Sequence, residues 1–581
     1  MRDAALFLEP DIEASSRDET WYLSSRVPLG PFERSVGAVL ERWAAATPDN
    51  DFLCERTAGG GWRRVTYGEA GAAARAIGQA LLDRGATADH PVMVLSGNSI
   101  DHGLVMLGCY LAGVPIAPVS VAYSTMSQDF AKLRRIAATT QPALIVVDGD
   151  GAPFAGALAA LRADGVTAEI VDDVDALLAA TPGAGLETAA AGVGPDTTAK
   201  YLFTSGSTGF PKGVINTHGM LCANQQMLRQ IWPFTASEPA VLLDWLPWSH
   251  TFAGNHDFNL VLWSGGTLYL DAGRPLPGLI DTTLHNLAEV SPTIYLSVPA
   301  GFAALVPHLE GDAALARSFF ARLRLILYAG AALPAEAWRR LDALAVRTIG
   351  RSVPFTSSWG TTETAPLATS AHFPLDGPGN IGVPVPGTTV KLVPNGRKLE
   401  LRVKGAAVTP GYIGEPELTA AAFDDEGFYL SGDAGRFADP DHPARGIVFD
   451  GRVVEDFKLQ SGTWVSVGTL RPQLVGAAAG AVTDVVITGH DEPELGVLVW
   501  LSASGDIEQL RAAIERHNAA HPQSSTRIGR ALVLTEPPSV DGHEITDKGY
   551  INQRAVLERR AADVARLHAT DPEDDILLLP R

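Results

Sequence analysis

A segment rich in glycine and hydroxyl side chains, residues 201–218, carries the strongest chemical signal in the sequence. It reads YLFTSGSTGFPKGVINTH and lies between two apolar stretches that we expect to form strands. Gly206 and Gly209 let backbone N–H groups approach an anion closely. Further donors are four hydroxyls and an ammonium, from Thr204, Ser205, Ser207, Thr208 and Lys212. The composition predicts a loop that binds phosphate, with a flexible surface loop as the alternative.

The spacing in this loop differs from that of a Walker A motif. That motif ends in Gly-Lys-Ser/Thr and opens a helix. Here Pro211 precedes Lys212, and the apolar run from Gly213 to Asn216 predicts a second strand. A P-loop NTPase is therefore disfavoured.

Four more segments carry charged and hydroxyl residues that could bind a nucleotide. They read SSWGTTETAP at 357–366, FYLSGDAGRF at 428–437, GRVVEDFKLQSGTWV at 451–465 and EITDKGYINQR at 544–554. Together with the glycine-rich loop, and in this order, they resemble the acyl-adenylate-forming family. That family includes acyl-CoA synthetases, firefly-type luciferases and peptide-synthetase adenylation domains. The resemblance extends from about residue 35 to residue 560.

The resemblance implies an enzyme that uses ATP to activate a carboxylic acid as an acyl-adenylate and then transfers the acyl group to coenzyme A. Two anions must meet in the first step, and at roughly 4 Å their repulsion is about 4 kcal/mol at an effective dielectric near 20. The family pattern implies that Thr204 and Glu363 help to hold Mg²⁺ and that Thr362 contacts phosphate. It also implies that Lys548 bridges the carboxylate and the α-phosphate. Taken singly, Glu363 could cap a turn and Lys548 could be an exposed lysine.

The same resemblance assigns the contacts to the nucleoside. Asp433 matches the ribose-binding aspartate, because a carboxylate can accept hydrogen bonds from both ribose hydroxyls, and Arg452 matches its ribose or phosphate partner. The segment YAGAAL at 328–333, with Ala331 and Ala332, resembles the adenine-facing loop. The opposite side of the adenine would be lined by Ser357, Ser358 and Trp359. Alone, Asp433 could be a turn residue and Arg452 a surface charge.

The acid is indicated by an aromatic segment, DWLPWSHTFAGNHDF at 244–258. With EDFKLQSGTWVSVGTLR, it looks most like the feruloyl-CoA synthetases, which implies ferulic or another hydroxycinnamic acid. Flat aromatic walls suit a planar conjugated ring. The predicted acyl pocket contains Trp248, His250, Phe252 and Tyr328. His250 could flank the acyl carboxylate or guard the thiol entrance, whereas Trp248 and Phe252 could instead be ordinary core residues.

The resemblance also implies a path for coenzyme A at the C-terminal domain. This domain is expected to bring Lys548 to the site of adenylate formation, the first half-reaction, and then to rotate for thioester formation, the second half-reaction. Lys458 and Gly462 lie where the family lines the thiol tunnel. The sequence departs from the family at Val454, two residues after Arg452, where the hinge often has Asp or Lys. Backbone torsions at the boundary could still absorb the rotation.

The elements that must position these motifs follow an alternating pattern. From about residue 35 to 370, helical patterns alternate with short apolar strands, which predicts βαβ units and an α/β fold. Short strands from about 380 to 450 indicate a small β-rich subdomain, and the rest predicts a small mobile α+β domain. We expect an N-terminal extension at 1–34, an AMP-binding domain at 35–450, a C-terminal domain at 451–565 and a tail at 566–581. The tail's acidic run DPEDD is expected to be solvated.

Charge and composition exclude several classes of function. The formal net charge of −21 opposes nonspecific binding to nucleic acid or anionic lipid. The apolar stretch at 103–123 is long enough to cross a bilayer, but Gly113 and Pro115 predict a buried helix followed by a strand. We therefore expect no membrane span and no nucleic-acid partner.

The cysteines and the N-terminus indicate where the chain works. The three cysteines lack disulfide or metal-ligand spacing, which suits a reducing compartment. The first residues are acidic and lack a long apolar run, so we expect neither a signal peptide nor a transit peptide, and we expect a cytoplasmic enzyme. The oligomeric state is left open, with a homodimer as one candidate.

Three rival functions share parts of this pattern. A ligase for fatty acids or other aryl acids would differ only in the shape of the acyl pocket. An adenylating enzyme could pass its product to a separate carrier protein instead of coenzyme A. A nucleotide-binding scaffold without turnover is a third candidate, which the presence of Glu363 and Lys548 disfavours.

Overall fold

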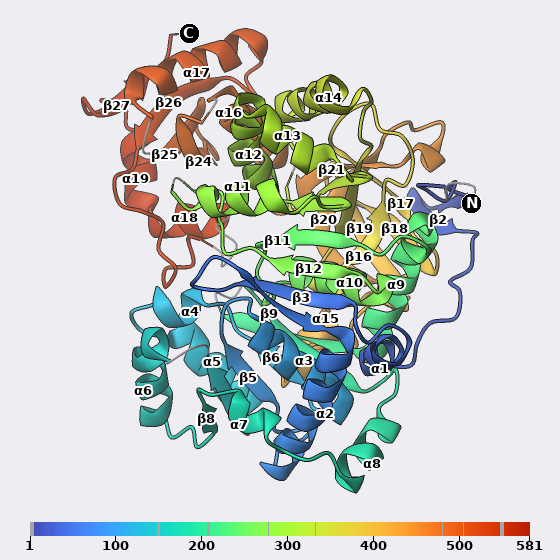
Figure 1. The fold of residues 1–581 in the computed structure, drawn as a ribbon. Helices are drawn as coiled ribbons and strands as arrows, with labels where there is room; N and C mark the ends of the chain where they lie inside the picture. The colour runs from blue at the N-terminus through green and yellow to red at the C-terminus, as the bar shows by residue number, and fades with distance from the viewer. Residues whose placement is uncertain are drawn as a thin grey trace.

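The computed structural model describes residues 5–147, 151–205, 210–276, 278–331, 333–478, 480–502, 505–545 and 551–580, and at Ser205 it describes the backbone alone. The predicted α/β fold is confirmed, since a large domain of mixed sheets and helices carries a small C-terminal domain. Figure 1 shows the small domain, in orange and red, at one end of the large domain.

The widest sheet joins segments from both ends of the large domain. Within the described residues it has eleven strands in the order β1-β2-β18-β19-β20-β21-β17-β16-β15-β14-β13. The neighbours β13, β14 and β15 are parallel, and the other pairs are antiparallel. The strands span β1 Ile12–Arg17, β2 Thr20–Ser25, β13 Ile294–Ser297, β14 Leu325–Tyr328, β15 Phe355–Gly360, β16 Leu367–Ser370, β17 Asn380–Pro384, β18 Thr388–Asn395, β19 Lys398–Gly405, β20 Tyr429–Phe437 and β21 Ile447–Arg452.

Two further sheets complete the large domain. One has the order β10-β9-β6-β5-β7-β8, and the other has the order β11-β12-β3-β4. Every pair is parallel except β9 with β10 and β3 with β4. The strands span β3 Asp51–Arg56, β4 Trp62–Thr66, β5 Val92–Leu95, β6 Ile116–Pro118, β7 Leu144–Val147, β8 Glu169–Val171, β9 Thr198–Ser205, β10 Pro211–Thr217, β11 Val241–Asp244 and β12 Thr267–Leu270. The strand predicted after the phosphate loop is confirmed as β10.

Helices cover the sheets and enclose the main apolar core. Figure 1 shows α2 and α3 against the strands of the blue half of the domain. The helices span α1 Val36–Ala46, α2 Tyr67–Asp83, α3 Ile100–Ala112, α4 Ala122–Thr125, α5 Ala131–Thr140, α6 Ala155–Ala163, α7 Asp175–Leu178, α8 Ala184–Gly192, α9 His218–Ile231, α10 Phe258–Ser264, α11 Ile280–Glu289, α12 Pro299–Gly311, α13 Ala313–Phe320, α14 Ala335–Ile349 and α15 Pro416–Ala421.

The apolar stretch at 103–123 folds into the predicted helix and strand. The hydroxyl of Ser99 caps α3 at its first turn, and Gly113 ends the helix with a left-handed φ of 67°. Every residue of α3 except Asp101 is buried, so this is a core helix that leads into β6. In the part of the chain that the structure describes, no helix combines the length and apolarity that a bilayer crossing needs.

The C-terminal domain has its own sheet and core. Its strands lie in the order β24-β25-β26-β27, and β22 and β23 form a separate hairpin. Buried apolar side chains of α16, α17 and the sheet pack together. The elements span β22 Phe457–Lys458, β23 Trp464–Val465, α16 Val467–Ala477, β24 Val482–Thr488, β25 Leu495–Leu501, α17 Ile507–Ala520, β26 Ile528–Val533, α18 Gln553–Arg559, α19 Ala561–Leu567 and β27 Ile576–Leu578.

Both ends of the chain are more structured than the sequence suggested. The expected N-terminal extension contributes β1 and β2, and β2 pairs with β18 of the large sheet. The expected tail contributes β27, which pairs with β26. The acidic residues before β27 are exposed, as expected, and Glu573 and Asp575 also pair with Arg566 at 2.7 and 2.8 Å. Apolar side chains at both ends gain burial by joining a sheet edge.

Candidate active site

The predicted phosphate loop joins two antiparallel strands. The register of β9 and β10 pairs Thr204 with Lys212 across the hairpin. The hydroxyl of Thr204 is buried and has no hydrogen-bond partner within the described residues. Because a buried hydroxyl without a partner is costly, this oxygen is suited to a ligand. The predicted loop residues Gly206, Ser207, Thr208 and Gly209 lie outside the described residues, as does the side chain of Ser205.

Lys212, Glu363 and Tyr412 form one hydrogen-bonded cluster beside this loop. Lys212 Nζ lies 3.2 Å from Glu363 Oε1 and donates to the Tyr412 hydroxyl at 2.7 Å. That hydroxyl donates to Glu363 Oε1 at 3.0 Å. Lys212 Nζ also lies 4.2 Å from the centre of the Tyr412 ring. A cation and a hydroxyl therefore hold one oxygen of the carboxylate.

The charge of Glu363 depends on these neighbours. Only 6% of its side chain is exposed, and burial alone would raise its pKa. The Lys212 ammonium, a backbone N–H and the Tyr412 hydroxyl outweigh burial and leave the pKa of Glu363 below its ordinary value. Burial and the nearby Glu363 raise the pKa of Tyr412, so the phenol stays protonated and can donate. The cluster thus keeps a carboxylate ionised inside the protein.

A short turn places Glu363 against the hairpin. After β15, residues Thr362–Thr364 form a single 3₁₀ turn, and the N–H of Thr409 donates to the Glu363 carbonyl at 2.8 Å. A β-carbon at Gly360 would clash with the carbonyl of Pro366, so only glycine fits where the chain turns back. Thr362 is also buried in this turn, next to the carboxylate.

A second carboxylate lies on an interior strand of the large sheet. Asp433 on β20 and Arg452 on β21 are register partners, and Arg452 Nε lies 3.1 Å from Asp433 Oδ1. The indole N–H of Trp359 donates to the other oxygen, Oδ2, at 3.0 Å. The structure therefore brings together three residues that the sequence assigned to the nucleoside. Trp359 lies four residues before Glu363, so the end of β15 lies close to the carboxylates of both Asp433 and Glu363.

The remaining nucleotide residues cluster at the ends of β14 and β15. Tyr328 is buried, and its hydroxyl accepts a hydrogen bond from Gly379 N at 3.0 Å. Ser357 pairs with Tyr328 in the sheet, and Ser358 donates to the hydroxyl of Ser370 at 3.1 Å. Ala331 is exposed just beyond β14, and Ala332 lies outside the described residues.

The aromatic segment lies mostly in the core. Trp248 is 1% exposed and packs edge-on against His102 and Phe258, with ring centres 5.2 and 5.1 Å apart. Phe252 begins a π-helical turn, Phe252–Asp257, and is also buried. His250 is partly exposed, and its Nδ1 accepts from the N–H of Phe252 at 3.3 Å. Among these residues, His250 is therefore the best placed to reach a ligand.

The predicted coenzyme A residues lie in the C-terminal domain. Lys458 and Gly462 lie on the β22–β23 hairpin, where Lys458 Nζ is 5.1 Å from the Trp464 ring centre. Gly462 turns the hairpin with a φ of 80°. Val454, in the boundary segment before this hairpin, is 77% exposed. Lys548 lies outside the described residues, and the flanking Ile545 and Ile551 pair by an antiparallel bridge.

Sequence reasoning missed Tyr412. It follows a Pro-Gly pair in TPGYIG, which favours a turn and gives no sign of a ligand role. Its hydroxyl binds Glu363 and Lys212, which are 49 and 200 residues away along the chain. A local pattern therefore could not have identified it.

The residues present fit the magnesium ion that the sequence implied. Mg²⁺ takes one or two carboxylates and completes its shell with water and substrate phosphates. Glu363 provides one ionised carboxylate, and Thr204 provides a buried hydroxyl without a partner in the described chain. Glu363 forms an ion pair with Lys212, and Thr204 is the strand partner of Lys212.

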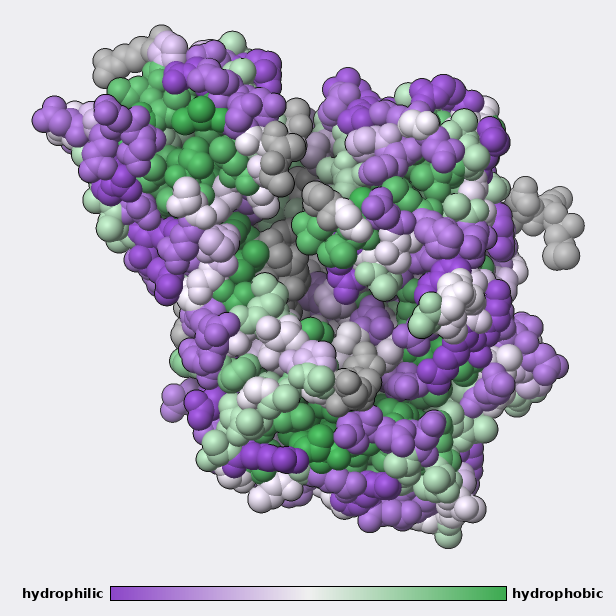
Figure 2. Space-filling view, turned by 60° about the vertical axis from the view of Figure 1, so that its left-hand side comes forward, coloured by the Kyte–Doolittle hydropathy of each residue, from purple (hydrophilic) through white to green (hydrophobic). Residues whose placement is uncertain are grey.

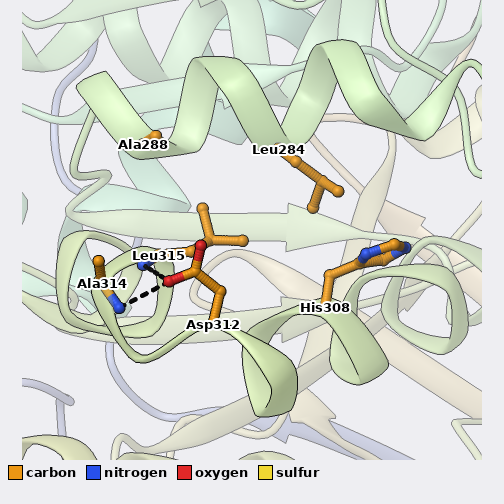
Figure 3. A pocket seen from close by; sticks show the side chains of 6 residues that line it. All are labelled: Leu284, Ala288, His308, Asp312, Ala314 and Leu315. Carbon is orange, nitrogen blue, oxygen red and sulfur yellow. Dashed lines mark hydrogen bonds between the residues drawn. The ribbon is translucent and has the colours of Figure 1, made fainter.

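A separate cavity of about 260 Å³ lies between α11 and the α12–α13 corner. Figure 3 shows Asp312 at its floor, with His308 and Leu284 on opposite sides. One oxygen of Asp312 accepts from the N–H groups of Ala314 and Leu315 at 2.8 and 3.0 Å, so this carboxylate caps α13. No predicted site residue lines the cavity.

Solved structures with this fold are adenylate-forming enzymes. The anthranilate CoA ligase AuaEII in complex with anthranoyl-AMP aligns with a TM-score of 0.72 at 18% identity, over 92% of this chain and 98% of that one. The O-succinylbenzoate coenzyme A synthetase MenE from Bacillus subtilis, in complex with AMP, aligns with a TM-score of 0.70 at 19% identity, over 90% and 98%. The two domains thus define an adenylate-forming fold.

The family follows from the sequence itself. The family model for the AMP-binding enzyme matches residues 40–413, and that for the AMP-binding enzyme C-terminal domain matches residues 472–571. The chain therefore belongs to the AMP-binding, adenylate-forming enzyme family, which includes the acyl- and aryl-CoA ligases.

Curated relatives are similar at moderate identity. The feruloyl-CoA synthase of Amycolatopsis sp is 29% identical over 383 residues, which cover 64% of this chain and 71% of that protein. The probable non-canonical nonribosomal peptide synthetase CymA of Salinispora arenicola (strain CNS-205) is 28% identical over 574 residues. That match covers 94% of this chain but only 7% of CymA.

Proposed function

We propose that this protein is an ATP-dependent carboxylate–CoA ligase. A carboxylate oxygen of the acid bonds to the α-phosphorus of ATP while the bond to the β-phosphate breaks, which yields the acyl-adenylate and pyrophosphate. The sulfur of coenzyme A then bonds to the acyl carbon as its thiol proton is released to solvent, and AMP leaves with the electrons of the broken acyl–oxygen bond. Family membership supports this reaction class.

The observation that carries the proposal is the Lys212–Glu363–Tyr412 cluster beside the glycine-rich hairpin. Lys212 Nζ is 3.2 Å from Glu363, so a cation and a metal-binding carboxylate meet where the phosphates of ATP would lie. Positive charge there offsets the repulsion between the acid and the triphosphate. When bound, Mg²⁺ supplies further charge neutralisation at the phosphates, held by Glu363 and Thr204.

The other residues have assigned roles in the same proposal. Asp433 accepts from the ribose hydroxyls, and Trp359 and Arg452 hold that carboxylate in place at 3.0 and 3.1 Å. Lys548 bridges the acid and the α-phosphate, and Thr362 contacts phosphate. The acid is already ionised at neutral pH, so these groups orient reactants and stabilise charge without removing a proton.

The acid we propose is ferulate or a related hydroxycinnamate. The similarity to a feruloyl-CoA synthase supports this choice. His250 is partly exposed and lies two residues before Phe252, where it can meet the acyl carboxylate. Coenzyme A would approach along Lys458 and Gly462 on the β22–β23 hairpin.

We place this reaction in the cytoplasm. The three cysteines are buried free thiols, which suits a reducing compartment.

A panel of acids tests the proposal. Purified protein with ATP, Mg²⁺ and coenzyme A would receive ferulate, p-coumarate, benzoate, anthranilate and octanoate in parallel, with products measured by mass spectrometry. We expect feruloyl-CoA, AMP and pyrophosphate in equal amounts, and the largest kcat/KM for a hydroxycinnamate. A larger kcat/KM for octanoate than for the hydroxycinnamates would contradict the proposed substrate. The absence of acid-dependent pyrophosphate exchange with every acid would overturn the reaction.

A carrier protein is the second candidate acceptor. The match to CymA spans 574 residues, so nearly the whole chain is similar to part of a peptide synthetase. Incubation with ATP, ferulate and a phosphopantetheinylated carrier domain, without free coenzyme A, distinguishes the two acceptors. Acylated carrier formed faster than feruloyl-CoA at equal thiol concentration would favour the carrier.

A further inference from the structure

The segment that leads to Lys548 is fixed to its own domain by a buried ion pair. Glu544 is fully buried, and its carboxylate accepts from Arg560 Nε at 2.6 Å and Nη2 at 3.1 Å. The same carboxylate accepts from the N–H of Ser539 at 2.8 Å, which closes the turn 539–544. A buried carboxylate with this many charged and neutral donors holds one geometry.

Three residues earlier, the same turn is bound to the large domain. Asp541 accepts from the hydroxyl of Ser127 at 2.6 Å and from the N–H of Gln128 at 2.9 Å. Lys132 Nζ donates to the Val540 carbonyl at 2.6 Å, and the Val540 side chain packs against an apolar cluster of the large domain. Figure 1 shows the red segment of the small domain reaching the cyan α4 and α5.

The contact also touches the phosphate hairpin. The ring of His543 packs edge-on against Phe210, the last residue of the glycine-rich loop, with ring centres 6.2 Å apart. Burial and the Lys132 ammonium lower the pKa of His543, so its ring is neutral in this contact. Figure 2 shows a hollow in the surface beside the lobe at its upper left. The turn 539–544 therefore bridges the domains close to the loop that is predicted to bind phosphate.

We propose that Asp541 is a positioning residue for adenylate formation: by binding Ser127 and Gln128 it locks the C-terminal domain onto the large domain in the orientation needed for the first half-reaction. The turn has one carboxylate for each domain, Glu544 for its own and Asp541 for the large one. Lys548 follows four residues after Glu544, so the lock sets where its segment begins. This inference rests on the proposed ligase function.

The proposal separates the two half-reactions. Adenylate formation needs the locked orientation, whereas thioester formation from a preformed adenylate does not need Asp541. Removing a hydrogen bond to a charged group, and the lock with it, should lower the rate of adenylate formation by about tenfold or more. A residue that only stabilised the fold would lower both half-reactions together.

Two variants remove the lock from opposite sides, Asp541→Ala and Ser127→Ala. The matched control is Asp491→Ala, because the Asp491 side chain is 79% exposed in the same domain. Acid-dependent exchange of labelled pyrophosphate into ATP reports the first half-reaction, with ferulate as the acid. Conversion of synthetic feruloyl-adenylate and coenzyme A to the thioester reports the second. Amide hydrogen exchange of residues 539–545 reports the contact itself.

We expect both variants to lose about tenfold in pyrophosphate exchange while thioester formation stays within twofold of wild type. The double variant should lose no more pyrophosphate exchange activity than the more impaired of the two single variants. Amide exchange at 539–545 should become faster in both single variants. Pyrophosphate exchange within twofold of wild type, equal losses in both half-reactions, or unchanged amide exchange would overturn the assignment of Asp541. A wild-type protein without pyrophosphate exchange would instead count against the proposed function, and amide exchange would still test the contact.

Discussion

At the scale of single residues, Tyr412 connects the charges of the candidate site. Its hydroxyl accepts from Lys212 and donates to Glu363, so it fixes the geometry between a cation and a carboxylate. A phenol can do this because it is both donor and acceptor. Either charge could otherwise move when an anionic substrate or a metal ion arrives.

Tyr412→Phe tests this connection. The substitution keeps the ring under Lys212 and removes only the hydroxyl, so Glu363 loses a donor. The cost of about 1–2 kcal/mol predicts a fall of roughly tenfold in the rate of acid-dependent pyrophosphate exchange. Tyr22→Phe is the control, since that hydroxyl binds Glu426 at an exposed site. Exchange unchanged in Tyr412→Phe would contradict the role of the hydroxyl.

Local patterns predicted the motifs at this scale, but not all their partners. Thr204, Glu363 and Asp433 were singled out because each lies in a segment with its own composition. The structure joins Lys212 to Glu363 and Asp433 to Arg452, while the roles of these residues stay predictions. Tyr412 was missed because tertiary packing alone brings it to them.

At the scale of elements, the sequence located strands better than it paired them. The helix and strand at 103–123 and the strands β9 and β10 on either side of the glycine-rich loop were predicted from apolar runs and breaker residues, whereas the pairing of β9 with β10 comes from the structure. The pairing of β2 with β18 was not predicted either, because it joins segments more than 360 residues apart. Periodicity shows that a strand exists, whereas its neighbour depends on which edge remains open.

Leu23→Ala tests whether β2 is part of the large domain. Leu23 is fully buried between the sheet and its apolar cluster. Truncating a buried leucine costs about 2–5 kcal/mol in the free energy of unfolding. Leu276→Ala should change it by less than about 0.5 kcal/mol, because Leu276 is 55% exposed. Urea denaturation followed by tryptophan fluorescence measures both, and equal effects would show that β1 and β2 are a loose extension.

The Glu544–Arg560 pair makes a similar prediction for the C-terminal domain. Arg560→Met would remove the cation that lies 2.6 Å from Glu544 and leave only Arg559, 3.8 Å away, at a cost of about 3–5 kcal/mol in the stability of that domain. The control is Arg554→Met, whose partner Glu558 shares an exposed site on the same helix, with side chains 65% and 64% exposed. Thermal unfolding would register the difference, and a loss under 1 kcal/mol for Arg560→Met would contradict it.

At the scale of the whole molecule, the large domain buries titratable groups that its proposed chemistry does not use. Burial lowers the pKa of His218 and His256 to about 3 and that of His102 to about 4. Burial also lowers the pKa of Lys200 to about 7. The folded protein keeps these histidines neutral where the unfolded chain would protonate them. Acid should therefore unfold the large domain well above the ordinary pKa of a carboxylate.

His218→Gln isolates one of these groups. Its folded pKa is lowered, so its contribution is intact above about pH 6.5 and is lost as the pH falls from there towards 3. The slope is about 1.4 kcal/mol per pH unit, so the free energy of unfolding of wild type should fall by about 2 kcal/mol more than that of His218→Gln between pH 7.5 and 5.0.

Glutamine can still accept from the N–H of Val36, as His218 Nδ1 does at 3.2 Å. His285→Gln, at a side chain 65% exposed, is the control for replacing a histidine at a solvated site. Parallel slopes for wild type and His218→Gln would mean that the buried imidazole is protonated in the folded state, against the low-dielectric packing that surrounds it.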